Sequence, residues 1–80
     1  MEQKIVVEIF GESYPLKTDQ DPLYLRKLAA LVDSEMRAAA QQTTDFSGVR
    51  VGVLAALKIA DEYFQLRKDY EELVAMVGRK

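Results

Sequence analysis

The feature that most constrains this fold is a long helical pattern at the C-terminal side of the chain. From Val49 onward the sequence has no proline, and its only glycines are Gly52 and Gly78. A helix over about residues 48–78 would be roughly 45 Å long at about 1.5 Å per residue. Because a single 80-residue domain is narrower than that, we expect part of this helix to project from its own domain or to pair with another chain.

Apolar side chains recur along this helix at alternating spacings of three and four, the heptad pattern typical of coiled coils. The predicted oligomer interface consists of Ala56, Ile59, Tyr63, Leu66, Tyr70, Leu73 and Val77. A second apolar stripe consists of Val53, Leu57, Ala60 and Phe64. It stops where the next positions in phase are Arg67 and Glu71. We expect the first half of the helix to contact both its own domain and a partner, and the second half to contact only a partner.

One alternative keeps the chain monomeric. The heptad stripe could fold back on the preceding helix as an αα-hairpin. That preceding helix is much shorter, so it should cover only the part with two apolar faces. The sequence therefore favours a dimer.

Residues 4–17 predict a β-hairpin. Ile5, Val7 and Ile9 recur with a period of two, as β-branched residues do in strands. The turn is expected at residues 11–13, where a glycine interrupts the pattern. Pro15 has no N–H to donate, so it should occupy an outward-facing position of the second strand. Because an isolated two-stranded hairpin is marginal in water, this one should lie against another element or another chain.

The next segment predicts an amphipathic helix that ends near Gln42. Asp21 is expected to cap its N-terminus ahead of Pro22, with Asp19 as the competing cap. The stripe expected to be buried contains Leu25, Leu28, Val32, Met36 and Ala39. Together these elements predict one α+β domain over residues 1–80.

Two parts of this domain are distinguished. The hairpin and the first helix occupy about residues 1–47, and the long helix at about residues 48–78 completes the head and forms the coiled-coil tail. The linker between the helices lies at residues 45–48, where Asp45 or Ser47 is expected to cap the long helix.

The residue types present predict no enzymatic activity, no metal site and no cofactor. The chain has no His and no Cys, so the commonest general base, the commonest zinc ligand and every thiolate are missing. Asp61 and Glu62 are adjacent, but neighbours on a helix point about 100° apart and do not readily share a proton or a metal ion.

Charge and hydropathy argue against a nucleic-acid-binding protein and against a membrane protein. Eleven basic and thirteen acidic residues give a net charge of −2, which argues against nucleic acid as a partner. The apolar runs are too short for a membrane span or a signal peptide, so we expect no membrane association and a cytoplasmic location. Arg37 and Arg50 flank the linker, and we predict that they form a small basic spot that binds an acidic partner.

Several short blocks together resemble the ZapA family of bacterial cell-division proteins. They are the residues around the turn, from Ile9 to Leu16, the helix opening from Asp21 to Ala29, and the block from Leu54 to Tyr63. This last block, LAALKIADEY, is similar to the family's ALNIADEL-type signature. The resemblance covers about residues 4–75, and the order and spacing of the blocks make it specific.

The resemblance implies a small α/β head, a C-terminal coiled-coil helix and no catalysis. It implies a homodimer, and two dimers that meet through their coils as an antiparallel homotetramer. It also implies that the protein binds FtsZ and cross-links and bundles its protofilaments at the mid-cell division ring.

Two departures from the family modify this expectation. The chain stops at Lys80, earlier than the longer members, so we expect a dimer or a compact tetramer. Glu12 stands where some relatives have a basic residue, so no partner-binding residue is carried over from the family. The alternative function is a generic coiled-coil dimeric adaptor whose partner is not FtsZ.

Overall fold

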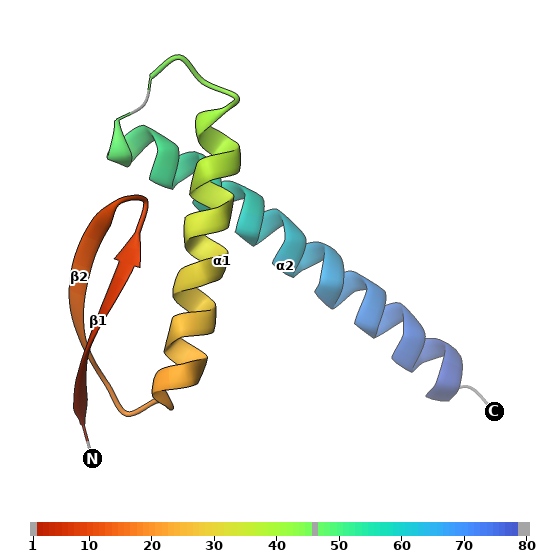
Figure 1. Ribbon diagram of the computed structural model, residues 1–80. Coiled ribbons are helices and arrows are strands. Elements are labelled where there is room, and N and C mark those ends of the chain that lie inside the picture. Colours follow the sequence, from red (N-terminus) through yellow and green to blue (C-terminus); the bar gives the residue numbers. More distant parts are fainter. Residues whose placement is uncertain (1, 46, 79–80) are drawn as a thin grey trace.

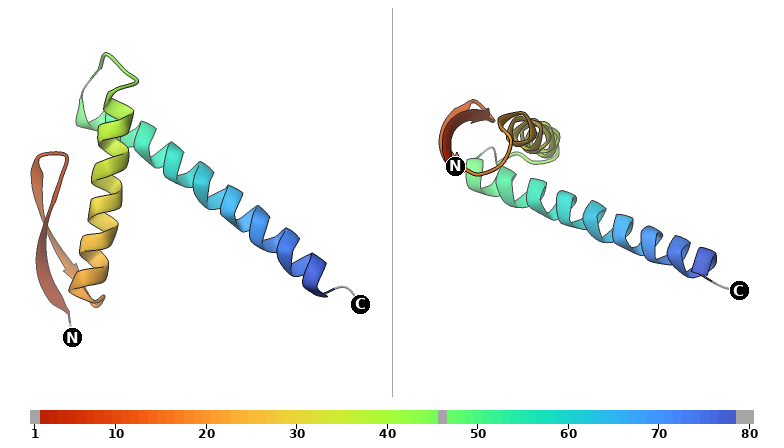
Figure 2. Two further views of the ribbon diagram at one scale, coloured as in Figure 1. Left: turned by 45° about the vertical axis from the view of Figure 1, so that its right-hand side comes forward. Right: turned by 90° about the horizontal axis from the view of Figure 1, so that it is seen from below.

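The computed structural model describes residues 2–45 and 47–78 as two strands followed by two helices (Figure 1). The elements are β1 (Gln3–Ile9), β2 (Glu12–Thr18), α1 (Pro22–Ala40) and α2 (Gly48–Gly78). The hairpin lies along α1. Helix α2 crosses α1 near the C-terminal end of α1 and then runs away from the head (Figures 1 and 2). The predicted α+β class and the order of its elements are confirmed.

The hairpin turn is tighter than the sequence predicted. Its two turn residues are Phe10 and Gly11, with φ of 52° and 82°, which is the type I′ geometry that suits the twist of a hairpin. The expectation of a turn at residues 11–13 is therefore wrong, since β2 already begins at Glu12. A phenylalanine at positive φ costs about 1–2 kcal/mol, so other contacts must stabilise this turn.

The register explains where Pro15 lies. Ile9 pairs with Glu12 next to the turn, and Val6 pairs with Pro15 three pairs further along. In a two-residue hairpin the pair beside the turn exchanges both hydrogen bonds, and such pairs alternate with pairs that exchange none. Pro15 therefore occupies a position whose nitrogen points away from β1, as its missing N–H requires.

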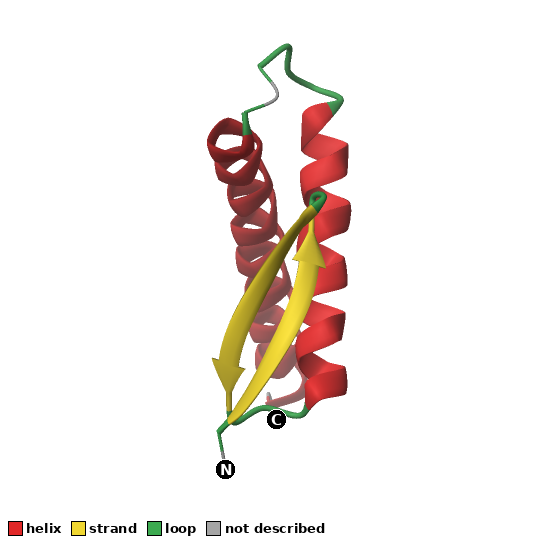
Figure 3. Ribbon diagram, turned by 60° about the vertical axis from the view of Figure 1, so that its left-hand side comes forward, coloured by secondary structure: helices red, strands yellow, loops and turns green. Residues whose placement is uncertain are grey.

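Two small clusters hold the head together. In the first, Ile5 and Val7 of β1 are buried against Ala29 of α1. In the second, where α2 crosses α1, Ala39 packs with Val51 and Ala55. Figure 3 shows the hairpin lying across α1. Because the contacting helix residues are mostly alanines, the backbones approach closely, and the head is thin.

Phe10 connects these two clusters. It follows β1 directly and packs against the second cluster, so the turn of the hairpin touches the place where the helices cross. This packing helps to offset the cost of its positive φ.

Helix α1 begins as predicted, but its buried face is shifted. Asp21 is the N-cap, and its Oδ1 accepts a hydrogen bond from the N–H of Leu23 at 2.9 Å. Within the stripe predicted to be buried, Leu28 is exposed, whereas Ala29 beside it is buried. The small side chain at this position lets β1 approach α1. The helix ends at Ala40, close to the predicted end.

Helix α2 also begins at the predicted residue, Gly48, but the side of the helix that packs against the head was not predicted. The Oγ of Ser47 accepts a hydrogen bond from the N–H of Arg50 at 3.2 Å, so Ser47 is the cap. The residues that α2 buries are Val51 and Ala55. The first half of the helix contacts the head as expected, but mainly through these two residues, which lie outside both predicted stripes; within the stripes, Ile59 is half-buried. The run of residues 49–57 is apolar on every side, and its pattern does not show which side packs.

Asp21→Ala tests the cap of α1. The variant leaves the first backbone N–H groups of the helix without an acceptor, so we expect the free energy of unfolding to fall by about 1 kcal/mol. Urea denaturation followed by circular dichroism measures the change. Asp19→Ala is the matched control, because Asp19 is exposed and does not cap the helix, and its effect should stay within about 0.5 kcal/mol. Equal losses in the two variants would contradict this assignment of the cap.

Candidate functional site

The most extensive candidate site is the second half of α2, which leaves the head (Figure 2). We define the tail stripe as Tyr63, Leu66, Tyr70, Leu73 and Val77. These side chains are between 54% and 76% exposed. The other two residues of the predicted interface lie nearer the head, where Ala56 is exposed and Ile59 is half-buried. After Ile59, every residue of α2 up to Gly78 is exposed.

The tail stripe has an apolar centre and charged edges. Tyr63, Leu66 and Tyr70 line an open hollow of about 570 Å³ on one side of the helix. Arg67 lies at its border, with its guanidinium carbon 5.8 Å from the centre of the Tyr63 ring and a nitrogen 3.6 Å from Glu71. This arrangement is typical of a helix that packs its apolar seam on a second helix and keeps its ion pairs at the rim.

The second stripe is exposed as well. Val53, Leu57 and Phe64 are between 54% and 63% exposed. The ring of Phe64 meets that of Tyr63 edge-on at 5.3 Å between centroids, so the two stripes touch each other at this point. In the single chain, both apolar faces of α2 are therefore open to solvent.

The predicted arginine pair lies at the other end of the molecule, and each member has its own carboxylate. The Nε of Arg37 is 2.9 Å from Asp33, and the Nε of Arg50 is 3.3 Å from Asp45. The two arginines line different hollows in the part of the chain that the structure describes. A joint basic spot for an acidic partner stays a prediction.

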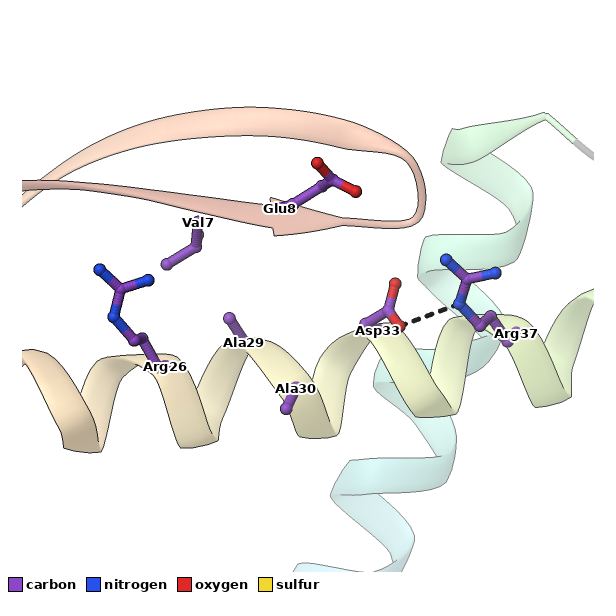
Figure 4. Close-up of a pocket in the computed structure, with 7 residues that line it drawn as sticks. All are labelled: Val7, Glu8, Arg26, Ala29, Ala30, Asp33 and Arg37. Carbon is purple, nitrogen blue, oxygen red and sulfur yellow. Dashed lines mark hydrogen bonds and ion pairs between the residues drawn. The ribbon is translucent and has the colours of Figure 1, made fainter.

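Asp33 is the functional residue that sequence reasoning missed. Its Oδ1 accepts a hydrogen bond from the N–H of Phe10 at 2.7 Å, and its Oδ2 accepts one from Arg37 (Figure 4). One carboxylate thus holds both the hairpin turn and a candidate partner-binding arginine. The spacing of four between Asp33 and Arg37 is visible in the sequence, but the contact with Phe10 spans 23 residues and is not.

These hydrogen bonds lower the pKa of the Asp33 carboxyl group. The bond from Arg37, followed by the bond from the Phe10 backbone, holds the pKa of Asp33 below its ordinary value of 3.8. A hydrogen bond from an N–H to the carboxylate favours the charged form, which is the direction observed.

Two further observations concern metal-binding groups and membrane-spanning helices. Residues 2–45 and 47–78 contain no group of three His, Cys, Asp or Glu side chains placed to hold a metal ion. In the same ranges, no helix is both long and apolar enough to cross a membrane.

The comparison with protein families agrees with this geometry. The family model described as "Cell division protein ZapA" matches residues 5–80. The chain belongs to the ZapA family. Two curated relatives described as cell division protein ZapA, from Geobacillus thermodenitrificans (strain NG80-2) and Bacillus thuringiensis (strain Al Hakam), are each 30% identical over 77 residues. That alignment covers 96% of this chain and 85% and 86% of the two relatives, so the resemblance seen in the sequence is confirmed.

A solved structure extends the match to three dimensions. It is described as a ZapA mutant dimer from Geobacillus stearothermophilus and superposes on this chain with a TM-score of 0.74 at 26% identity. The match covers 99% of this chain and 92% of that one. The ZapA architecture therefore includes both the head and the projecting helix.

Asp33→Asn tests the hydrogen bonds at the hairpin turn through their pH dependence. Because the folded protein lowers the pKa of Asp33, the stability that this carboxylate contributes is fully present above its ordinary pKa of 3.8. It is lost as the pH falls through the lower folded value. We expect the urea midpoint of the wild type to fall more steeply between about pH 5 and about pH 2 than that of Asp33→Asn.

Asp61→Asn is the control for the change in net charge, because it removes a carboxylate from an exposed position of α2. The wild type and Asp33→Asn would have parallel pH profiles if the contacts of Asp33 did not stabilise the folded state, and that result would contradict its role.

Proposed function

We propose that this ZapA-family chain is a non-enzymatic accessory of cell division that self-associates through α2 and cross-links FtsZ protofilaments. The observation that carries the proposal is the exposed tail stripe, which has no partner among the described residues of its own chain. The family assignment supports FtsZ as the partner and the mid-cell division ring, in the cytoplasm, as the location.

The free energy available from the tail stripe is sufficient for self-association. Fully burying a large apolar side chain is worth about 1.5–3 kcal/mol. Two copies would bury their five side chains each, which is enough to offset an association cost of about 4–15 kcal/mol. A 31-residue helix with half its length unsupported gains further, since isolated helical segments are marginal in water. The description of the Geobacillus stearothermophilus relative as a dimer supports self-association of this chain.

The proposed mechanism is multivalency. Each assembly, a dimer or a compact antiparallel tetramer, carries several heads joined by α2 helices of fixed length. Weak contacts between one head and a filament become effective when a second head is held at a set distance from it. Arg37 and Arg50 are the proposed contacts of each head with an acidic surface of the filament, and Asp33 and Asp45 hold them in place.

Leu66→Glu is the variant that separates self-association from filament binding. It places a carboxylate in the middle of the tail stripe, where burial of an unpaired charge is costly. We expect the mass measured by light scattering to fall to that of a single chain. Gln65→Glu is the matched control, because it adds the same charge at the neighbouring position, outside both stripes, and should keep the wild-type mass. A wild-type mass for Leu66→Glu would contradict the placement of the interface.

Sedimentation with GTP-assembled FtsZ from the same source then tests the function. We expect the wild type and Gln65→Glu to increase the low-speed pellet, which contains only bundles, because both can join two filaments. Leu66→Glu should still enter the high-speed pellet with single filaments but should no longer increase the low-speed pellet.

Reversing both head charges, in Arg37→Glu/Arg50→Glu, should keep the oligomer and reduce co-sedimentation at both speeds. Undiminished co-sedimentation would refute the role of the two arginines. If the wild type enters neither pellet at several salt concentrations, the partner is not FtsZ and the protein is a coiled-coil adaptor for another protein.

A further inference from the structure

We propose that the outer edge of β1, together with the side of α1 beneath it, binds an extended acidic segment of a partner protein. This surface is separate from the tail stripe, and the proposal does not depend on FtsZ being the filament that the heads contact.

The backbone at this edge of the hairpin is open. Within residues 2–45 and 47–78 the sheet has only two strands, so β1 has a neighbour on one side alone. The register and the two-residue turn direct the N–H and C=O groups of Lys4, Val6 and Glu8 toward the free side. On the free side of β2 the central position is Pro15, which has no N–H. The two edges therefore differ, and β1 offers the complete row of donors and acceptors that an added strand requires.

A hollow lies beside this open edge. It has a volume of about 320 Å³ and lies between β1 and α1 (Figure 4). Val7 and Glu8 line it from β1, Ala29 and Ala30 contribute to the lining from α1, and the side chains of Arg26, Asp33 and Arg37 rise from α1 around it. Because the α1 residues that line the hollow between Arg26 and Asp33 are alanines, no large side chain of α1 fills that part of it.

The charges around the hollow favour an acidic occupant. Glu8 and Asp33 both line the hollow, but Asp33 is already paired with Arg37, and the carboxylate of Glu8 is turned away from α1 (Figure 4). Arg26 extends from α1 toward β1 and makes no ion pair with any residue in the described ranges. Arg37 uses one of its five N–H groups for Asp33, so it retains donors for a second carboxylate.

The spacing of the two arginines sets the pattern of the occupant. Arg26 and Arg37 are about three helical turns apart, which is roughly 16 Å along the axis of α1. On a strand, positions i and i+4 lie on the same face and are about 13 Å apart at about 3.3 Å per residue, so the arginine side chains have to cover a remaining difference of about 3 Å. An extended segment with acidic side chains at positions i and i+4, and a small apolar one between them above the alanines, would reach both guanidinium groups while its backbone pairs with β1.

The test uses the full chain labelled with ¹⁵N and a seven-residue synthetic peptide, acetyl-TETVTET-amide. We expect saturable shifts of the backbone amide signals of Lys4, Val6 and Glu8. Arg26→Gln should weaken the peptide's affinity at least fivefold, because it removes the unpaired cation. Lys17→Gln is the matched control, because it removes a cation from the outer face of β2, away from the hollow, and should leave the affinity unchanged.

A second peptide, acetyl-TKTVTKT-amide, separates charge recognition from general strand addition. It should give no saturable shift. Equal binding of the two peptides would overturn the proposal, as would the absence of saturable shifts at millimolar peptide or shifts confined to α2. Amides of β1 that become protected from hydrogen exchange as the concentration of free protein rises would show that a second copy covers this edge, and that result would also overturn it.

Discussion

Within residues 2–45 and 47–78, the second half of α2 finds no apolar surface to pack against, and the rest of this structure depends on that constraint. The chain measures 52 × 41 × 14 Å along its principal axes, so it is long and flat. Such a thin chain covers only the faces where two elements touch. Val51 and Ala55 are covered by the head, while the tail stripe and the second stripe are left in solvent. The long helix is therefore explained as a structural element completed by another chain.

In the head, a small buried core holds the hairpin in place. Its two clusters contain three buried residues each, and half of these residues are alanines. Phe10 connects the clusters although it has an unfavourable positive φ. The carboxylate of Asp33 accepts a hydrogen bond from the backbone N–H of Phe10, which has no partner within the turn. Because Asp33 also binds Arg37, the hairpin turn and a candidate contact for a partner are held by the same group. The head thus presents defined charges at one end, and α2 carries the apolar surface to the other.

Much of this arrangement was predictable from local patterns. The period of two in β1, the Asp21–Pro22 cap and the heptad spacing of α2 each follow from neighbouring residues, and each matches the observed element. The turn was placed wrongly because phenylalanine rarely adopts positive φ, and the hydrogen bond that stabilises it comes from Asp33, far away in the sequence. The face of α2 that meets the head was also misjudged. Around Val51 and Ala55 every side of the helix is apolar, so periodicity carries no information there, and close packing against Ala39 decides the outcome.

We infer that residues 60–78 of α2 are kept folded by another copy of the chain. Hydrogen exchange of the backbone amides, measured by mass spectrometry over a range of protein concentrations, tests it most directly. We expect exchange in residues 60–78 to slow as the concentration rises, while protection of α1 and β1 near the first cluster stays constant. Protection of residues 60–78 that is the same at every concentration would contradict it, because the helix would then be stable without a partner.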